Sequence, residues 1–253
     1  MDAPVSDVAV NPCKLVPGML LAPPTPGTIT IDGDLSDWGA AAFTLLEPSN
    51  AALILGPNGT CTAANATSQC LVPAAETAEV ALLFDATSLY VGVRVTVPNV
   101  GGASTTAPYT NDAVELYLRG DTMPTGDYGA DDHQYVIDWQ NLVTDYGPGA
   151  TGMGQSSPAG VTSAVKVAAG NGAYVVEAKI ALTGLGQTTL APGQTLGFDL
   201  GVDHGQGMLS TRSLIVWWMA THAAPTCTST KCKGCNPDEP SCDTLDFGLV
   251  CAQ

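Results

Sequence analysis

Strict alternation of apolar and other residues is the feature that most constrains how this chain folds. From Leu89 to Val97 every odd-numbered position holds Leu or Val, and the even-numbered positions hold Tyr, Gly, Arg and Thr. A period of two places alternate side chains on opposite faces of an extended strand, so one face of this strand is apolar. A second apolar stretch, Val80–Phe84, precedes it across a short turn at 85–88. We therefore predict a β-hairpin here.

Strand signals of this kind recur along the chain, separated by loops rich in Gly, Pro, Ser and Thr. No segment keeps a helical apolar period for three turns, and the best helical turn is Leu182–Leu185. We expect an all-β fold, an antiparallel β-sandwich with jelly-roll or immunoglobulin-like topology. The other strand candidates are Ala113–Leu118, Gln134–Trp139, Val161–Val167, Tyr174–Ile180, Leu196–Val202, Leu214–Met219 and Leu245–Val250.

A chain of 253 residues with 45% hydrophobic content can bury the core of one large domain. We expect the sandwich to occupy residues 28–222. An N-terminal arm, residues 1–27, and a Cys-rich tail, residues 223–253, are expected to pack on it as loops stapled by disulfides.

Eight cysteines lie in polar, loop-like sequence, and their even number predicts disulfides and an exported protein. The start, Met1-Asp2-Ala3-Pro4, resembles an initiator Met placed before a mature N-terminus, so we expect a secreted or cell-surface protein whose leader has been removed. Cys61 and Cys70 bracket a compact loop and are the pair we predict. The tail could instead be a four-thiolate zinc site. The cysteines are Cys13, Cys61, Cys70, Cys227, Cys232, Cys235, Cys242 and Cys251.

The net charge of the chain limits the classes of partner that it can bind. Eight Lys and Arg residues stand against 24 Asp and Glu, a formal net charge of −16, which repels nucleic acid and anionic membrane surfaces. No run of eighteen apolar residues would insert into a membrane. We expect a neutral or cationic partner.

Two segments carry residues suited to binding a neutral ligand. In Ile31–Trp38 an apolar strand runs into a carboxylate-rich Gly turn, and Trp38 should fold back to anchor it; a structural corner is the alternative. In Ala113–Arg119, Glu115, Tyr117 and Arg119 share the face opposite to the apolar one, close to Tyr109. Aromatic faces pack on sugar C–H surfaces while carboxylates accept hydroxyl hydrogen bonds. A solvated face with a cross-strand salt bridge is the alternative.

Carboxylates at strand ends suggest structural calcium, which takes oxygen ligands. His133 and His204 each adjoin an Asp, which would also permit transition-metal or general-base chemistry, although such neighbours are usually surface polar pairs. Nucleophile-elbow, phosphate-loop and dinucleotide motifs do not occur, so we expect no enzymatic activity. The predicted calcium ligands come from Asp32, Asp34, Asp37, Asp85 and Asp203.

A tryptophan pair in the strand Leu214–Met219 offers a further aromatic surface. Neighbouring strand residues face opposite ways, so one of Trp217 and Trp218 should be core and the other a ligand platform.

The segments described above, in their order along the chain, resemble the family 9 carbohydrate-binding modules and the wider DOMON-like group. The resemblance runs from about Thr28 to Met219. It implies a β-sandwich with bound calcium and, in sugar-binding members, two aromatics that sandwich a terminal sugar beside a Glu, a Gln and an Arg. Its matching segments are Ile31–Trp38, Asp85 with Ser88–Val95, Asn111–Leu118, Tyr174–Ile180, Gly193–Asp203 and Arg212–Trp218.

Carried onto this chain, the resemblance assigns the first aromatic to Tyr109, where the family usually has Trp. The second is Trp217 or Trp218. Glu115 matches the carboxylate, Gln134 the amide and Arg212 the arginine. The long Cys-bearing loop Pro57–Cys70 and the Cys-rich tail depart from the family pattern.

Two other functions remain open. The wider group includes extracellular domains that bind haem through Met and His or Lys. Here Met123, Met153, Met208 and Met219 are available, but no placed Met–His pair stands out. The third alternative is a surface or matrix protein that uses the sandwich as a scaffold.

Overall fold

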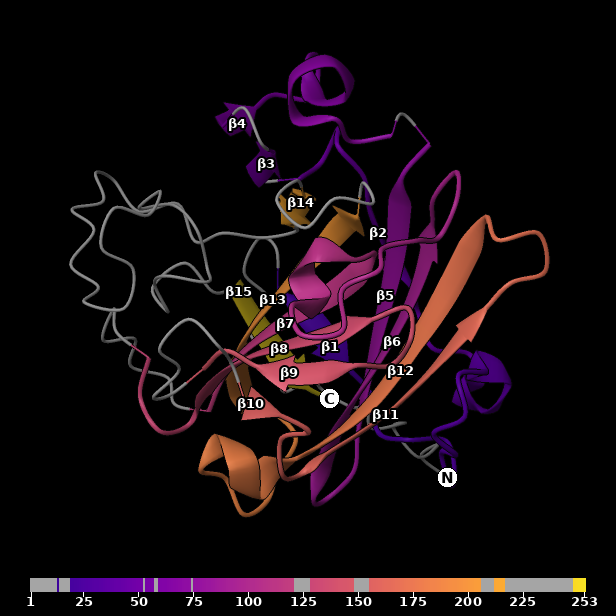
Figure 1. Cartoon of the computed structure of the whole chain (residues 1–253). Coiled ribbons are helices and arrows are strands. Elements are labelled where there is room, and N and C mark those ends of the chain that lie inside the picture. The colour runs from indigo at the N-terminus through magenta and orange to yellow at the C-terminus, as the bar shows by residue number, and fades with distance from the viewer. Residues whose placement is uncertain are drawn as a thin grey trace, which may run out of the picture.

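Two β-sheets packed face to face form the body of the protein in the computed structural model (Figure 1). The structure describes residues 13, 19–51, 53–56, 59–73, 75–120, 128–147, 155–205, 212–216 and 248–253. Within these ranges the regular structure is strands and helices of three to five residues, which confirms the predicted all-β sandwich. No helix in the same ranges has the length and apolar character needed to cross a membrane.

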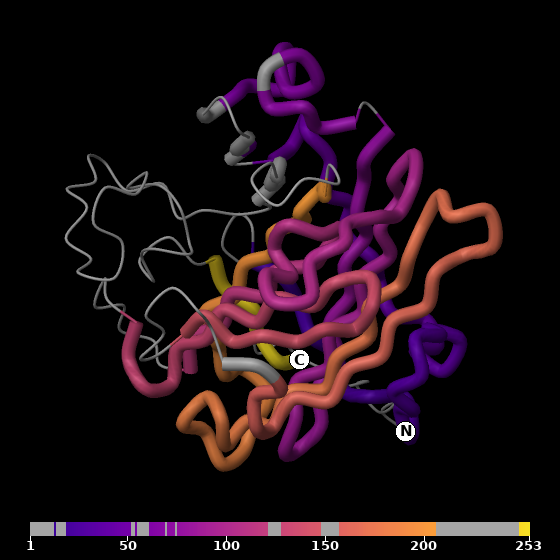
Figure 2. Tube along the Cα trace, in the orientation of Figure 1, coloured from indigo at the N-terminus to yellow at the C-terminus, as the bar shows by residue number. Residues whose placement is uncertain are grey.

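The smaller sheet has the strand order β11-β12-β6-β5-β2, antiparallel throughout. Its centre is the predicted hairpin, and the turn that closes it is held by Asp85, which accepts hydrogen bonds from the backbone and hydroxyl of Thr87. Figure 2 shows β11 and β12 as a long hairpin at one edge. The strand bounds are Thr44–Leu46 (β2), Thr77–Phe84 (β5), Ser88–Thr96 (β6), Val161–Val167 (β11) and Ala173–Ala181 (β12).

The larger sheet has ten strands, eight of them in the order β10-β9-β8-β7-β13-β14-β3-β4. β13 is its longest strand and pairs antiparallel with β7, β14 and β15. The bounds are Leu53–Gly56 (β3), Gly59–Cys61 (β4), Ala113–Arg119 (β7), Asp132–Asp138 (β8), Val143–Asp145 (β9), Gln155–Ser156 (β10), Thr195–Gly205 (β13) and Arg212–Val216 (β14).

Described parts of both terminal segments enter this sheet. The predicted strand Leu245–Val250 overlaps the last strand, whereas the N-terminal arm, expected to be a loop, contributes another. β1 (Leu20–Ala22) pairs in parallel with β15 (Gly248–Ala252), and β15 pairs with β13. A disulfide joins Cys13 to Cys251. A three-residue strand before two prolines carries no readable alternation, which is why the sequence predicts an arm there. The four tail cysteines, Cys227, Cys232, Cys235 and Cys242, lie outside the described residues.

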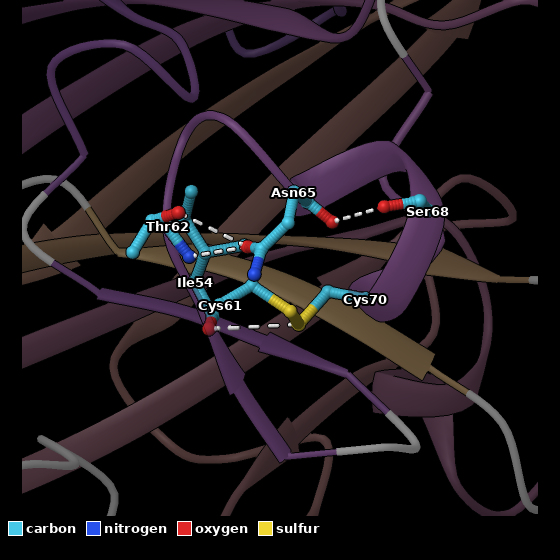
Figure 3. Close-up of a disulfide and its surroundings, with 6 residues drawn as sticks. All are labelled: Ile54, Cys61, Thr62, Asn65, Ser68 and Cys70. Carbon is cyan, nitrogen blue, oxygen red and sulfur yellow. Dashed lines mark hydrogen bonds between the residues drawn. A yellow bond between two sulfur atoms is a disulfide. The ribbon is translucent and has the colours of Figure 1, made fainter.

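The predicted Cys61–Cys70 disulfide is confirmed (Figure 3). It closes the segment between β4 and a short π-helix, η2 (Ala66–Cys70). Inside this loop, Asn65 accepts hydrogen bonds through Oδ1 from the backbone N–H and hydroxyl of Thr62, and its carbonyl accepts one from the Ser68 hydroxyl. The segment is therefore a compact unit beyond the end of the sandwich.

The core lies between the sheets, as the alternation predicts. β6 contributes Leu89, Val91, Val93 and Val95, each at most 1% exposed, and β7 contributes Val114, Leu116 and Leu118. Burial of these side chains supplies the main driving force for packing. Three 3₁₀ turns, the last at the predicted helical position, are η1 (Leu35–Trp38), η3 (Pro108–Thr110) and η4 (Leu182–Leu185).

Candidate functional site

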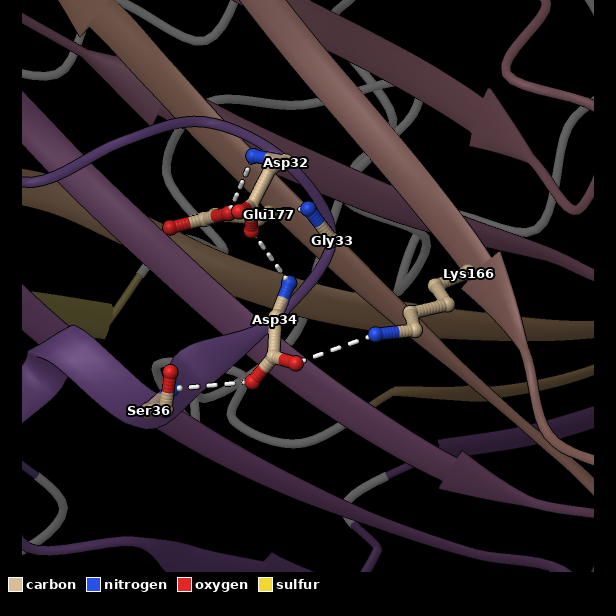
Figure 4. Close-up of polar contacts among 6 residues, drawn as sticks. All are labelled: Asp32, Gly33, Asp34, Ser36, Lys166 and Glu177. Carbon is tan, nitrogen blue, oxygen red and sulfur yellow. Dashed lines mark hydrogen bonds and ion pairs between the residues drawn. The ribbon is translucent and has the colours of Figure 1, made fainter.

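The carboxylate-rich turn after Ile31 is a structural corner held by one buried glutamate. Glu177 of β12 accepts hydrogen bonds through Oε2 from the backbone N–H groups of Asp32 (2.9 Å) and Gly33 (3.0 Å), as Figure 4 shows. Its Oε1 accepts one from Trp38 Nε1 at 2.8 Å. Trp38 is 1% exposed, so the predicted anchor is confirmed.

Close packing against the neighbouring strand explains the glycine of this turn. Gly33 has φ +80°, and an added Cβ there would lie 2.9 Å from Lys166 Cβ. Lys166 also forms an ion pair with Asp34 at 3.0 Å. This turn therefore fixes the N-terminal segment to the outer face of the smaller sheet.

Four of the predicted calcium ligands accept hydrogen bonds that hold turns in the structure. Asp32 and Asp34 each accept a backbone hydrogen bond within their own turn, and Asp37 accepts one from Thr30 N at 2.7 Å. Asp85 accepts hydrogen bonds from the β5–β6 turn, while Asp203 lies in the other sheet. Among the described residues no three His, Cys, Asp or Glu side chains are spaced as metal ligands. These aspartates do not fit a shared calcium site, and calcium binding stays a prediction.

The outer face of the larger sheet carries the polar residues of β7. Glu115 alternates with the core-facing Val114 and Leu116, and the register sets Gln134 of β8 opposite Tyr117. Gln134 Nε2 donates to Glu115 Oε2 at 3.3 Å, and the Tyr117 hydroxyl donates to the same oxygen. The structure thus brings Glu115 and Gln134 together, as predicted.

The burial of β7 bears on the alternative of a solvated face. All seven residues of β7 are buried, including Glu115 at 0% and Arg119 at 4% exposed. The alternative of a solvated face is therefore wrong. Buried polar groups persist where they are paired, and Glu115 is paired with Gln134 and Tyr117.

Tyr109 stands beside this polar pair. It lies in η3 and packs edge to face against Tyr146, with ring centroids 5.5 Å apart and planes at 74°. The two rings pack on Ala113 and Val136, and the register places Val136 directly opposite Glu115. Three predicted residues, Tyr109, Glu115 and Gln134, therefore lie in one region of the outer face.

Two residues of this region were not predicted as ligand residues. Tyr117 could have been included from its alternation with Glu115, since both share a face. Tyr146 follows a three-residue strand without readable periodicity, and only the pairing of β9 with β8 brings it there.

The other predicted ligand residues are only partly described. The backbone of Arg212 pairs with Gly205. β14 ends at Val216, whose partner Gly201 pairs in turn with Glu115. Trp217 and Trp218 follow directly and lie outside the described residues.

A second polar network holds the loop that carries Tyr109. Asp112 Oδ2 accepts a hydrogen bond from Gly101 N at 2.6 Å, and its Oδ1 accepts from Gly205 N at 2.8 Å. Asn111 exchanges hydrogen bonds with the backbone of Ser104. The network closes the 101–112 loop and fixes the position of Tyr109.

His133 makes a separate buried contact on β8. Its Nδ1 lies 2.7 Å from Asp145 Oδ2, and its Nε2 lies 2.9 Å from the carbonyl of Gly184. Burial opposes a charge on this imidazole, but the Asp145 carboxylate outweighs that effect and raises the pKa of His133. This contact ties β8 to η4 and serves the fold.

Comparison with known proteins identifies the family of this chain. A family model described as "Carbohydrate family 9 binding domain-like" matches residues 58–226, more than half of the chain. The chain belongs to this family.

Solved structures show the same fold. A carbohydrate-binding module of family 9 from Caldicellulosiruptor kristjanssonii in complex with cellotriose aligns with TM-score 0.64 and 20% identity, covering 93% of each chain. The same organism's family 9 module in complex with glucose aligns with TM-score 0.62 over 92% of this chain and 95% of that one, also at 20% identity.

Curated relatives are much longer proteins. Endo-1,4-beta-xylanase A of Thermotoga maritima is 31% identical over 141 residues, which is 56% of this chain and 12% of that protein. Endo-1,4-beta-xylanase A of Thermoanaerobacterium saccharolyticum is 28% identical over 192 residues, 76% of this chain and 14% of that protein. The similarity therefore covers a small part of each enzyme.

Proposed function

We propose that this domain binds a neutral oligo- or polysaccharide, with Tyr109 as one wall of the site and Glu115 and Gln134 as its polar side. The observation that carries the proposal is the convergence of these three residues on the outer face of the larger sheet. An aromatic ring beside a carboxylate and an amide is the usual chemistry for a sugar, whose C–H face is apolar and whose edge carries hydroxyls. Trp217, Trp218 and Arg212 complete the proposed site on sequence grounds.

Family membership and the bound ligands of the structural neighbours, cellotriose and glucose, support this substrate class. The formal charge of −16 favours a neutral glycan over an anionic one. We propose that the domain itself is not catalytic and that it acts outside the cell, where the two described disulfides are stable.

Affinity electrophoresis tests the proposal. The wild-type protein should migrate more slowly in gels that contain a neutral β-glucan or xylan than in gels without polysaccharide. Glu115→Gln should lose most of this retardation, because a hydrogen bond to a charged group contributes about 1.5–3 kcal/mol. Glu79→Gln is a matched control, since Glu79 is half exposed on the smaller sheet. If no neutral polysaccharide retards the wild-type protein, the scaffold alternative replaces this proposal.

A further inference from the structure

An unusual buried glutamate lies away from the proposed sugar site. Glu76 precedes β5 and is 0% exposed, and neither of its carboxylate oxygens has a hydrogen-bond partner among the described residues. The hydroxyl of Tyr174, also wholly buried, has none in the same part of the chain. Buried polar atoms are almost always paired with protein, water or an ion, so this region calls for an additional partner.

Two further side chains face Glu76 between the sheets. His204 Nδ1 lies 4.0 Å from Glu76 Oε2 and 2.9 Å from Asp112 Oδ1. Asp112 is 0% exposed, and the side chain of His204 is 15% exposed. Burial raises the pKa of Tyr174, and four nearby carboxylates, with the largest effects from Asp112 and Glu76, raise it further. Three elements, the start of β5, the start of β7 and the end of β13, thus converge here.

A charged Glu76 is costly without a cation nearby, because neither of its buried carboxylate oxygens has a hydrogen-bond partner among the described residues. Two buried carboxylates face one imidazole, and a buried charge is tolerated when it is paired or bound to a metal. A divalent ion would neutralise both carboxylates. Calcium takes oxygen ligands only, whereas an imidazole nitrogen beside carboxylates is a ligand set of zinc and related ions.

We propose that Glu76, Asp112 and His204 form a buried site for a divalent transition-metal ion of the zinc class. Ligand atoms around such an ion lie about 3–3.5 Å apart, given bonds of about 2.0–2.2 Å. In the structure these three side chains are not yet spaced as metal ligands. The 2.9 Å between His204 Nδ1 and Asp112 Oδ1 approaches this spacing, and the 4.0 Å between His204 Nδ1 and Glu76 Oε2 is too long. No hydrogen bond among the described residues holds the Glu76 oxygens, and binding requires this side chain to rotate toward the imidazole.

Binding requires the unprotonated form of His204 Nδ1, so the ion replaces any proton that this nitrogen shares with Asp112. The ion would also stabilise the 101–112 loop through Asp112, whose Oδ2 accepts the hydrogen bond from Gly101. The site contains none of the proposed sugar ligands, although Asp112 belongs to the network that fixes Tyr109. The inference does not depend on the proposed function.

The test is isothermal titration calorimetry of the metal-stripped whole chain with ZnCl₂ or CaCl₂ alone. Thermal unfolding is then measured with and without the metal. Wild-type protein should bind one Zn²⁺ at this site and gain about 5–10 °C in Tm at a hundredfold excess over Kd. Glu76→Gln and His204→Gln should each lose that Tm gain and at least tenfold in Zn²⁺ affinity. Glu79→Gln, three residues further along in β5, should behave as wild type.

Three results would overturn the proposal. The first is no Zn²⁺ binding by the wild-type protein. The second is Zn²⁺ binding that survives both variants, which would place the ion elsewhere, for example on tail thiolates. The third is Ca²⁺ binding lost in Glu76→Gln but kept in His204→Gln. If a variant does not fold, Co²⁺ added to the wild-type protein decides: visible bands without a thiolate charge-transfer band support this site, and a thiolate band contradicts it.

Discussion

Replacing Glu177 with Ala should destabilise the protein strongly, because this one side chain satisfies three N–H donors. Two of them, the Gly33 backbone N–H and Trp38 Nε1, are buried. Each buried donor left without a partner costs about 1–3 kcal/mol, so the loss is about 2–6 kcal/mol. At about 2–4 °C per kcal/mol for a chain of this size, Tm should fall by roughly 5–20 °C. Glu177→Gln keeps one carbonyl oxygen and should lose about half as much.

Urea unfolding followed by far-UV circular dichroism measures the difference. Glu79→Ala is the control, because Glu79 is half exposed and its 3.9 Å contact with Arg94 is an exposed ion pair of small energetic value. We expect the control to stay within about 0.5 kcal/mol of wild type. If Glu177→Ala were no more destabilising than Glu79→Ala, the account of this turn as a corner held by Glu177 would be refuted.

Three further predictions concern stability. Removing the Cys61–Cys70 disulfide by a double Ala substitution should lower the free energy of unfolding by about 2–3 kcal/mol, because the disulfide restricts the unfolded chain over a loop of sequence separation 9. An unchanged midpoint of urea unfolding would contradict this. Gly33→Ala should cost about 1–2 kcal/mol, since its φ of +80° disfavours a Cβ; a neutral effect on Tm would show that the turn relaxes. Charged His133, whose pKa Asp145 raises above 6.5, stabilises the fold fully below about pH 6.5, and this contribution is lost as the pH rises through the raised value. The stability gap between wild type and His133→Gln should therefore shrink above pH 6.5, and a gap independent of pH would exclude this role.

The sequence predicts what is local and periodic. The hairpin of β5 and β6 follows from alternation within residues 77–96, and the two faces of β7 follow from the same rule. β1 was missed because three residues are too few to show a period, and its partner β15 lies at the other end of the chain. Trp38 could be assigned as an anchor, but its acceptor, 139 residues later, could not.

The candidate site was predictable to the same degree. Strand alternation and the family resemblance predicted Glu115, Gln134 and Tyr109 as site residues. The strand register shows that they lie together. Tyr146 depends on strand pairing alone. Glu76 is one acid among 24 at the start of a strand, and its burial without a partner is visible only in three dimensions.

Isothermal titration of cellotriose into the wild-type protein and into Tyr109→Ala tests the central claim most directly. A buried aromatic contact contributes about 0.5–1.5 kcal/mol beyond the burial of its area, so the variant should bind at least several-fold more weakly while its far-UV spectrum and Tm match those of the wild type. Equal affinity of a folded Tyr109→Ala variant, or no heat from the wild type with any neutral oligosaccharide at millimolar concentration, would contradict the assignment of this face as the sugar site.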